Sequence, residues 1–157
     1  MDIQLLRIDD RLIHGQVVIG WASQLNTREI ILCDDSVAEN EWEKELYLAC
    51  VPQTITSRIM TVRDTADYLQ HESNDLRRTI LLVESPLVIE SLLDAGVPVK
   101  DVNVGGMHFK DQRRKFLPYL YMNDEDISSF NRCMEREVHF TCLDVPNGKK
   151  IELKRIL

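Results

Sequence analysis

The sequence predicts an α/β fold, with an open, mostly parallel sheet of about seven strands and helices on both faces. Short apolar runs alternate along the chain with segments of helical spacing, which is typical of strand–helix–strand units. One run, TILLVE at residues 79–84, is apolar without alternation, as expected of a central strand covered on both faces. No linker, repeat or low-complexity tract divides the 157 residues, so we expect a single domain over residues 1–157.

Seven apolar runs predict the strands. They cover residues 3–8, 29–34, 57–62, 79–84, 101–106, 116–122 and 138–145. The fifth run, DVNVGG, ends in a glycine turn. The sixth contains Pro118, which cannot donate a hydrogen bond to a neighbouring strand, so we expect this strand at an edge.

The segments between these runs predict helices, because their apolar side chains recur every three or four residues. The residues that share a helical face are Val17, Trp21 and Leu25 in a helix at 15–25; Trp42, Leu46 and Ala49 in a helix from about 37 to 50; Ala66 and Leu69 in the next; and Ile127, Phe130 and Met134 in a helix that starts at Asn123. Ser85 and Pro86 fit the N-cap and first residue of a further helix, which Gly96 ends. A short segment near 151–157 is also expected to be helical.

The charge balance argues against a nucleic-acid partner. The 26 acidic and 19 basic residues give a formal net charge of −7, which repels phosphate backbones, and the basic clusters at 113–115 and 149–150 are short. No apolar run approaches the ~18 residues of a membrane span. The first ten residues lack the basic and apolar regions of a signal peptide, so we expect a cytoplasmic protein.

The motifs of common cofactor sites are missing. The four cysteines form no C-x-x-C pair, which argues against a zinc or thioredoxin-like site, and Cys33 and Cys142 are expected to be buried. Neither GxxxxGK[ST] nor GxGxxG occurs, so nucleotide binding has no motif support. We expect neither a cofactor nor a metal.

The segment DDRLIHG follows the first predicted strand and precedes a helix. Ligands bind at the carboxyl ends of strands in open parallel sheets. The backbone N–H groups of Gly15, Gln16 and Val17 would form an anion site at the helix N-terminus, and Arg11 would add a planar cation suited to phosphate. His14 would lie next to both as a neutral nucleophile. This combination predicts a covalent phosphate carrier that needs no nucleotide.

Other roles for these residues stay open. A histidine in a loop is often a solvated or capping residue, and Asp9 and Asp10 could either cap the turn or orient His14 and Arg11. The remaining histidines are weaker candidates. His71 lies at a helix end, His139 alternates with apolar residues in a strand, and His108 follows a GGM turn that could approach the same sheet edge.

A receiver domain offers a rival interpretation of the acidic pair. Such a domain binds Mg²⁺ beside two acidic residues after its first strand and is phosphorylated on an aspartate after its third. Asp9 and Asp10 fit the pair, but Asp64 comes two residues late, and glycines stand where a lysine is needed after the fifth strand. The receiver pattern therefore fits poorly.

The segment RIDDRLIHGQVVIGW strongly resembles the phosphorylation-site segment of the IIB component of the mannose/fructose/sorbose class of the bacterial phosphotransferase system. The resemblance continues in IILCDDSVAEN, in VNVGGMHF and in the ending KKIELKRIL. It implies a protein-N(pi)-phosphohistidine–sugar phosphotransferase with an open α/β sheet. A IIA partner would phosphorylate His14 on Nδ1, and Arg11 would support the transfer. Asp9, Asp10, Gly15 and Gln16 also match the motif.

The resemblance also implies partners. Membrane components IIC and IID would hold the hexose or hexose derivative that receives the phosphate, and would recruit the protein to the membrane. Because the motif begins almost at residue 1, we expect IIA on a separate chain. The alternative is a regulatory module that keeps the phosphorylatable histidine but phosphorylates no sugar directly.

Overall fold

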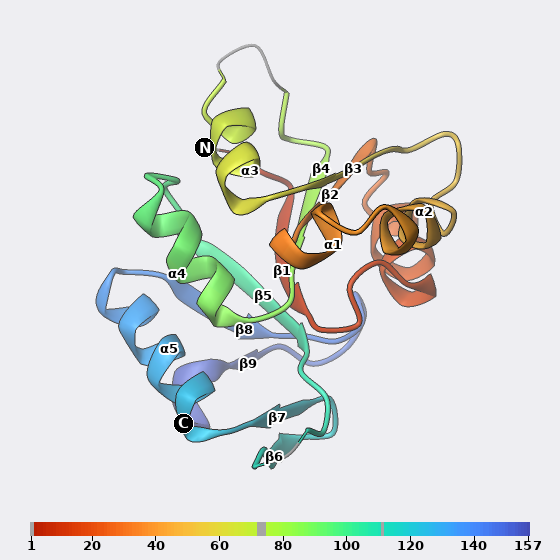
Figure 1. Ribbon diagram of the computed structural model, residues 1–157. Coiled ribbons are helices and arrows are strands. Elements are labelled where there is room, and N and C mark those ends of the chain that lie inside the picture. Colours follow the sequence, from red (N-terminus) through yellow and green to blue (C-terminus); the bar gives the residue numbers. More distant parts are fainter. Residues whose placement is uncertain (1, 72–74, 111) are drawn as a thin grey trace.

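A seven-stranded sheet forms the centre of the molecule (Figure 1). The computed structural model describes residues 2–71, 75–110 and 112–157, and of Gln16 and Val18 only the backbone. The strands are β1 Leu5–Asp9, β2 Glu29–Cys33, β3 Thr56–Met60, β4 Thr79–Val83, β5 Asp101–Gly106, β8 His139–Cys142 and β9 Ile151–Glu152. Their order is β3-β2-β4-β1-β5-β8-β9, and every neighbouring pair is parallel except β8 and β9. The predicted mostly parallel sheet is confirmed.

Helices cover both faces of the sheet, as predicted (Figure 1). One face packs against α3 Val62–Leu69, α4 Pro86–Asp94 and α5 Asp124–Glu135, and the other against η1 Gln16–Ala22, α1 Asp35–Ala38 and α2 Glu41–Leu48. A hydrophobic core lies on each face of the sheet, and the interior strand β4 contributes to both. Leu81 and Val83 belong to the first core, and Ile80 and Leu82 belong to the second. Among the described residues, no helix has the length and apolar character needed to span a membrane.

The connections that leave β1 and its neighbour β4 indicate where a ligand would bind. The chain leaves β1 towards η1 on one face, whereas it leaves the adjacent β4 towards α4 on the other. Neighbouring strands whose connections diverge in this way form the topological switch point, at which open parallel sheets bind ligands. The carboxyl end of β1 therefore lies at the favoured position for a functional site.

The predicted sixth strand is wrong. Residues 116–122 do not form one edge strand of the main sheet; they belong to an antiparallel hairpin of β6 Arg114–Leu117 and β7 Leu120–Met122. Pro118 lies in the turn between the two, because its fixed backbone and missing N–H suit a turn better than a ladder. Met107 joins the hairpin to the end of β5 through hydrogen bonds with the backbone of Tyr119 and Tyr121. The seventh strand of the main sheet is β9, and the 3₁₀ helix η2 Leu153–Arg155 follows it. Of the helix expected at 151–157, only these three middle residues are helical.

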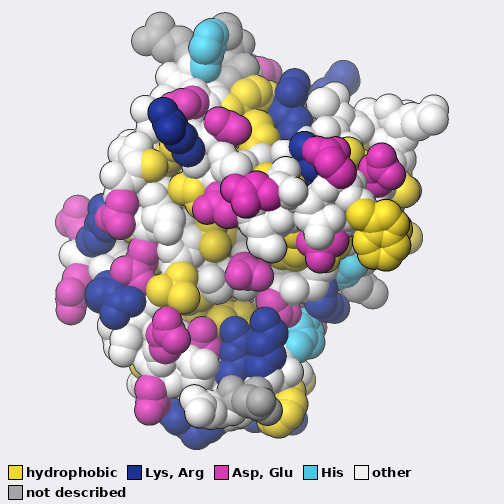
Figure 2. Space-filling model, viewed as in Figure 1, with side chains coloured by type: hydrophobic (Ala, Val, Ile, Leu, Met, Phe, Trp, Pro, Cys, Tyr) yellow, Lys and Arg dark blue, Asp and Glu magenta, His cyan; other side chains and the backbone are white. Residues whose placement is uncertain are grey.

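The helix expected at 37–50 is divided into α1 and α2. The side chain of Asn40 accepts a hydrogen bond from the backbone of Glu43, so a new helix starts there. The predicted apolar face of this helix is also wrong. The side chains of Trp42 and Leu46 are 71% and 51% exposed, and Figure 2 shows hydrophobic side chains at the surface here among acidic ones. The restart at Asn40 changes which residues of α2 face the sheet.

The helix expected at 15–25 is present but has π-helical geometry over Gln16–Ala22. Val17, Trp21 and Ala22 are buried, so the predicted apolar face is confirmed. A π-helix bonds residues five positions apart, and such segments occur frequently at functional sites. Side-chain spacing does not distinguish this geometry from an α-helix over so short a stretch.

The four cysteines are free thiols. Cys33 and Cys142 are buried, as predicted. Burial raises the pKa of Cys33 to about 11 and that of Cys142 to about 12, so both behave as small apolar side chains.

Candidate functional site

The segment between β1 and η1 is anchored by two apolar side chains. Leu12 and Ile13 are 5% and 2% exposed and belong to the core beneath η1. Leu12 has a φ of 64°, a left-handed conformation that costs a leucine about 1–2 kcal/mol. Arg11 and His14, on either side, keep 38% and 19% of their side chains exposed. The buried pair thus holds the loop while the two polar residues face outwards.

Asp9 is the centre of the site. It is the last residue of β1 and has no solvent exposure. Its Oδ2 accepts hydrogen bonds from Arg7 Nη2 at 3.2 Å, Arg11 Nη2 at 3.0 Å and His14 Nε2 at 3.0 Å. Its Oδ1 accepts from the backbone N and the Nε of Arg11, both at 3.1 Å. Asp9 therefore caps the turn and also orients Arg11 and His14, so both of its predicted roles are present.

The donors around Asp9 keep it ionised. Burial alone raises the pKa of this carboxyl, but the hydrogen bonds from His14 and Arg11 and the charge of Arg7 outweigh that effect and hold the pKa well below its usual range. An ionised carboxylate can only accept hydrogen bonds. The proton of the His14–Asp9 hydrogen bond therefore belongs to Nε2, and in the neutral ring the lone pair belongs to Nδ1.

Arg7 is the residue that sequence reasoning missed. It lies within the apolar run of β1, is fully buried, and donates to Asn103 Oδ1 at 2.6 Å and to Asp9. It also donates to the backbone oxygens of Leu143 at 3.0 Å and Asp144 at 2.9 Å. The only sign of Arg7 in the sequence is its charge, which stands between the apolar residues Leu6 and Ile8. Arg7 connects β1, β5 and the loop after β8 to the carboxylate of Asp9.

A glycine makes room for Arg7. A Cβ on Gly105 would lie 2.0 Å from the Arg7 Cζ. The guanidinium therefore packs directly on the backbone of β5, and the first glycine of the predicted turn is required by this contact.

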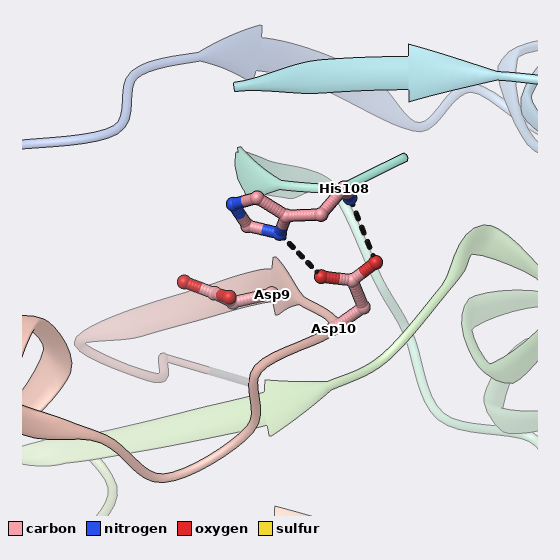
Figure 3. A group of neighbouring side chains, drawn as sticks. All are labelled: Asp9, Asp10 and His108. Atoms are coloured by element: carbon pink, nitrogen blue, oxygen red, sulfur yellow. Dashed lines mark hydrogen bonds and ion pairs between the residues drawn. The ribbon is translucent and has the colours of Figure 1, made fainter. Parts of the chain in front are cut away.

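Asp10 belongs to a second group of polar residues. Its Oδ1 lies 2.7 Å from His108 Nδ1, and its Oδ2 accepts from the His108 backbone N at 2.8 Å and from Arg113 Nη1 at 3.1 Å. Arg113 also donates to Asp126 at 3.0 Å. Figure 3 shows that only the Asp10 carboxylate is turned towards His108. Successive residues of an extended chain point in opposite directions, which explains why Asp9 and Asp10 have separate partners.

The two groups approach each other at Gly106, which pairs with Asp9 at the end of β1. A Cβ on Gly106 would lie 2.8 Å from His108 Cε1, 3.4 Å from Asp9 Oδ1 and 3.5 Å from Arg11 Nη2. His108 therefore lies at the same sheet edge as Arg11, the approach that the GGM turn made possible. On the visible face in Figure 2, basic side chains gather beside a histidine near the β6–β7 hairpin.

Two further predicted residues follow His14 directly in the chain. Gly15 begins the helical segment after His14, and a Cβ there would meet nothing within 4 Å. Gln16 starts η1, and its side chain lies outside the described residues. The first N–H groups of any helix have no partner within it, so the backbone here fits the expected anion site. His139 lies at the opposite end of the sheet, with Asp101 and Glu152, and the exposed His71 follows α3.

One carboxylate oxygen of Asp9, one of Asp10 and one ring nitrogen of His108 lie within 4.8 Å of one another, close enough to hold a metal ion (Figure 3). Every one of these oxygens already accepts a hydrogen bond from an arginine, a histidine ring or the backbone. A metal would have to displace these donors, so the residues present fit a metal site poorly. The receiver interpretation fails further, because β2 and β4 separate β3 from β1 and keep Asp64 away.

Comparison with known families gives a match over nearly the whole chain. Residues 3–157 match the model of the "PTS system sorbose subfamily IIB component". The fructose-specific EIIB component of Bacillus subtilis (strain 168) is 33% identical over 157 residues, which cover 100% of this chain and 96% of that protein. The mannose-specific EIIAB component of Escherichia coli (strain K12) is 30% identical over all of this chain, which covers 49% of that protein.

Solved structures agree with this match. A protein described as a phosphoenolpyruvate-dependent phosphotransferase system superposes with a TM-score of 0.91 at 33% identity, covering 99% of this chain and 97% of the other. The IIBSor domain of the sorbose permease from Klebsiella pneumoniae superposes with a TM-score of 0.88 at 25% identity, covering 98% and 94%. These structures share the α/β fold described above.

Proposed function

Because the chain belongs to the sorbose-subfamily IIB components of the phosphotransferase system, we propose that it takes a phosphoryl group on Nδ1 of His14 and passes it to a sugar. The observation that supports this assignment is the 3.0 Å contact between His14 Nε2 and the ionised Asp9. It fixes the ring and places the lone pair on Nδ1, the atom that would attack phosphorus.

The transfer needs two displacements at phosphorus. In the first, the Nδ1 lone pair of His14 forms a bond to phosphorus while the N–P bond of the donor histidine breaks and returns its electron pair to the donor nitrogen. In the second, a sugar hydroxyl oxygen bonds to phosphorus and releases its proton to solvent, while the N–P bond of His14 breaks and returns its electron pair to Nδ1. Asp9 stabilises the positive charge on the phosphorylated ring through Nε2–H.

Arg11 and the first backbone N–H groups of the helical segment, at Gly15 and Gln16, would bind the phosphoryl oxygens. Arg11 is fixed by three hydrogen bonds to Asp9 and remains 38% exposed, so it is both oriented and accessible. Donors held in this way would stabilise the negative charge that accumulates in the transition state.

Arg11→Lys is expected to slow phosphoryl transfer without abolishing it. Lysine keeps the charge but loses the planar arrangement of donors that binds Asp9 and a phosphate oxygen together. Loss of one preorganised donor lowers rates by ~10²–10³ at other sites, and the retained charge should reduce this effect. Rapid-quench measurement of transfer to each protein tests the expectation. An unchanged rate would remove Arg11 from the site.

The partners follow from the family. We propose that residues 1–157 act as one IIB domain in the cytoplasm, that a IIA component donates the phosphate, and that IIC and IID recruit the phosphorylated protein to the membrane. The substrate class is a hexose or hexose derivative. Fructose, sorbose, mannose and N-acetylgalactosamine appear in the names of the relatives, which supports this class.

The chemistry of the bond tests the assignment to histidine. A phosphate on His14 is expected to be labile in acid, stable in alkali and resistant to hydroxylamine, because protonation of the ring makes it a better leaving group. A phosphate on Asp9 or Asp10 would instead be released by alkali and hydroxylamine, which attack the carbonyl. Phosphorus NMR of the labelled protein before and after each treatment distinguishes the two. A signal that hydroxylamine erases and acid preserves would overturn the histidine mechanism.

A further inference from the structure

His108 is held as firmly as His14, but by the other aspartate. Asp10 accepts from both the ring Nδ1 and the backbone N of His108, at 2.7 and 2.8 Å. Arg113 Nη1 donates to Asp10 and to the His108 carbonyl oxygen at 2.9 Å, and its Nε is fixed by Asp126. The side chains of these three supporting residues are 5–7% exposed. The ring of His108 itself is 39% exposed.

The ring lies beside Arg11 at the end of β5. His108 Cε1 and Arg11 Nη2 both lie within 3.5 Å of the position that a Cβ of Gly106 would occupy. Cε1 is bonded to Nε2, so this nitrogen and the guanidinium are within reach of the same phosphoryl group. If any residue other than glycine stood at position 106, its Cβ would lie 2.8 Å from the His108 ring.

We propose that His108 is a second phosphate-binding residue, which donates a hydrogen bond from Nε2 to a phosphoryl oxygen while Asp10 accepts from Nδ1. This inference rests on the proposed phosphorylation of His14. Both nitrogens donate only in the imidazolium ion, so His108 binds the phosphoryl group in its charged form. Arg11 and His108 would then hold the transferring group from two sides.

The charged residues near His108 have both signs. Asp10 and Asp9 are negative, whereas Arg11, Arg113 and the following Lys110 are positive. Glu84 interacts electrostatically with Asp10, Arg113 and Lys110. A phosphoryl group adds up to two negative charges beside the ring and attracts its proton.

Transfer kinetics with His108 variants test the proposal. His108→Ala is expected to lower kcat for transfer from phospho-IIA by about 10-fold or more, since removal of one preorganised donor costs ~10²–10³ at other sites and Arg11 remains. KM for phospho-IIA should change little. His108→Gln, which keeps an N–H donor at the corresponding reach, should recover much of the rate. His139→Ala, at the opposite end of the sheet, is the matched control and should behave as wild type.

NMR of the wild-type protein gives a second measurement, which would show no change if His108 had only a structural role. The ring ¹⁵N and ¹H resonances of His108 should move towards those of the imidazolium ion when His14 is phosphorylated at constant pH. Unchanged resonances, or equal rates for His108→Ala and wild type, would overturn the proposal. So would equal losses in the alanine and glutamine variants together with a lowered Tm in both, which would mark a structural role.

These results separate two failures. A wild-type protein that accepts no phosphate would overturn the proposed function and this inference with it. A wild-type protein that is phosphorylated on His14, with a normal rate in His108→Ala, would overturn the inference alone.

Discussion

Replacement of His14 by alanine is expected to give a folded protein that takes no phosphoryl group from phospho-IIA. The side chain lies in a loop, and Asp9 keeps four other hydrogen-bond donors from Arg7 and Arg11, so the fold should tolerate its truncation. It does remove the nucleophile, and a group-transfer step without its nucleophile has no alternative route at this site. Radiolabel transferred from phosphoenolpyruvate through the general phosphotransferase proteins and a cognate IIA measures acceptance.

The control for this experiment is His71→Ala, since His71 lies after α3 and outside the site. It should accept label as wild type does, and both variants should keep the wild-type circular dichroism spectrum. Stoichiometric labelling of His14→Ala would show that the central assignment is wrong.

The same variant separates a transfer enzyme from a regulatory module. In membranes that contain IIC and IID, wild-type protein should convert sugar to sugar phosphate, and His14→Ala should not. If wild-type protein is phosphorylated on His14 but forms no sugar phosphate with any cognate membrane components, the regulatory alternative is favoured instead.

Gly105→Ala is expected to have the largest effect on stability. The added methyl would lie 2.0 Å from Arg7 Cζ and 2.3 Å from its two terminal nitrogens, so the guanidinium would have to move. Arg7 is fully buried, and displacing it would break its hydrogen bonds to Asn103, Asp9 and two backbone oxygens. Breaking a buried charged pair costs about 3–5 kcal/mol.

Thermal and urea unfolding measure this effect. For a domain of this size, a loss of about 3–5 kcal/mol lowers Tm by roughly 6–20 °C. Gly15→Ala is the matched control for stability, because a Cβ at position 15 meets nothing within 4 Å, and its Tm should stay close to that of wild type. A Tm for Gly105→Ala within about 2 °C of wild type would show that the guanidinium can leave its position at little cost.

The fold could be predicted largely from local patterns. Continuous apolar runs such as residues 79–83 mark strands covered on both faces, and the spacing of Val17 and Trp21 marks a buried helical face. Where such patterns were ambiguous, the prediction failed. Trp42 and Leu46 have the spacing of a core face, yet the helix restarts at Asn40 and leaves both exposed. The run at 116–122 contains Pro118, and it forms a hairpin turn in place of one strand.

The sequence by itself determined the α/β class, the location of the site after the first strand, and the residues Arg11, His14 and Asp9 that meet there. The class follows from the alternation of strands and helices along the chain, and the three site residues meet because they belong to one short segment. Only the tertiary structure decided that Arg7 supports Asp9 through partners 96 to 137 residues away, and that Asp10 holds His108 from a distance of 98 residues. Such contacts depend on which strands become neighbours, because parallel strands brought together by crossover connections place side chains from distant segments at one sheet edge.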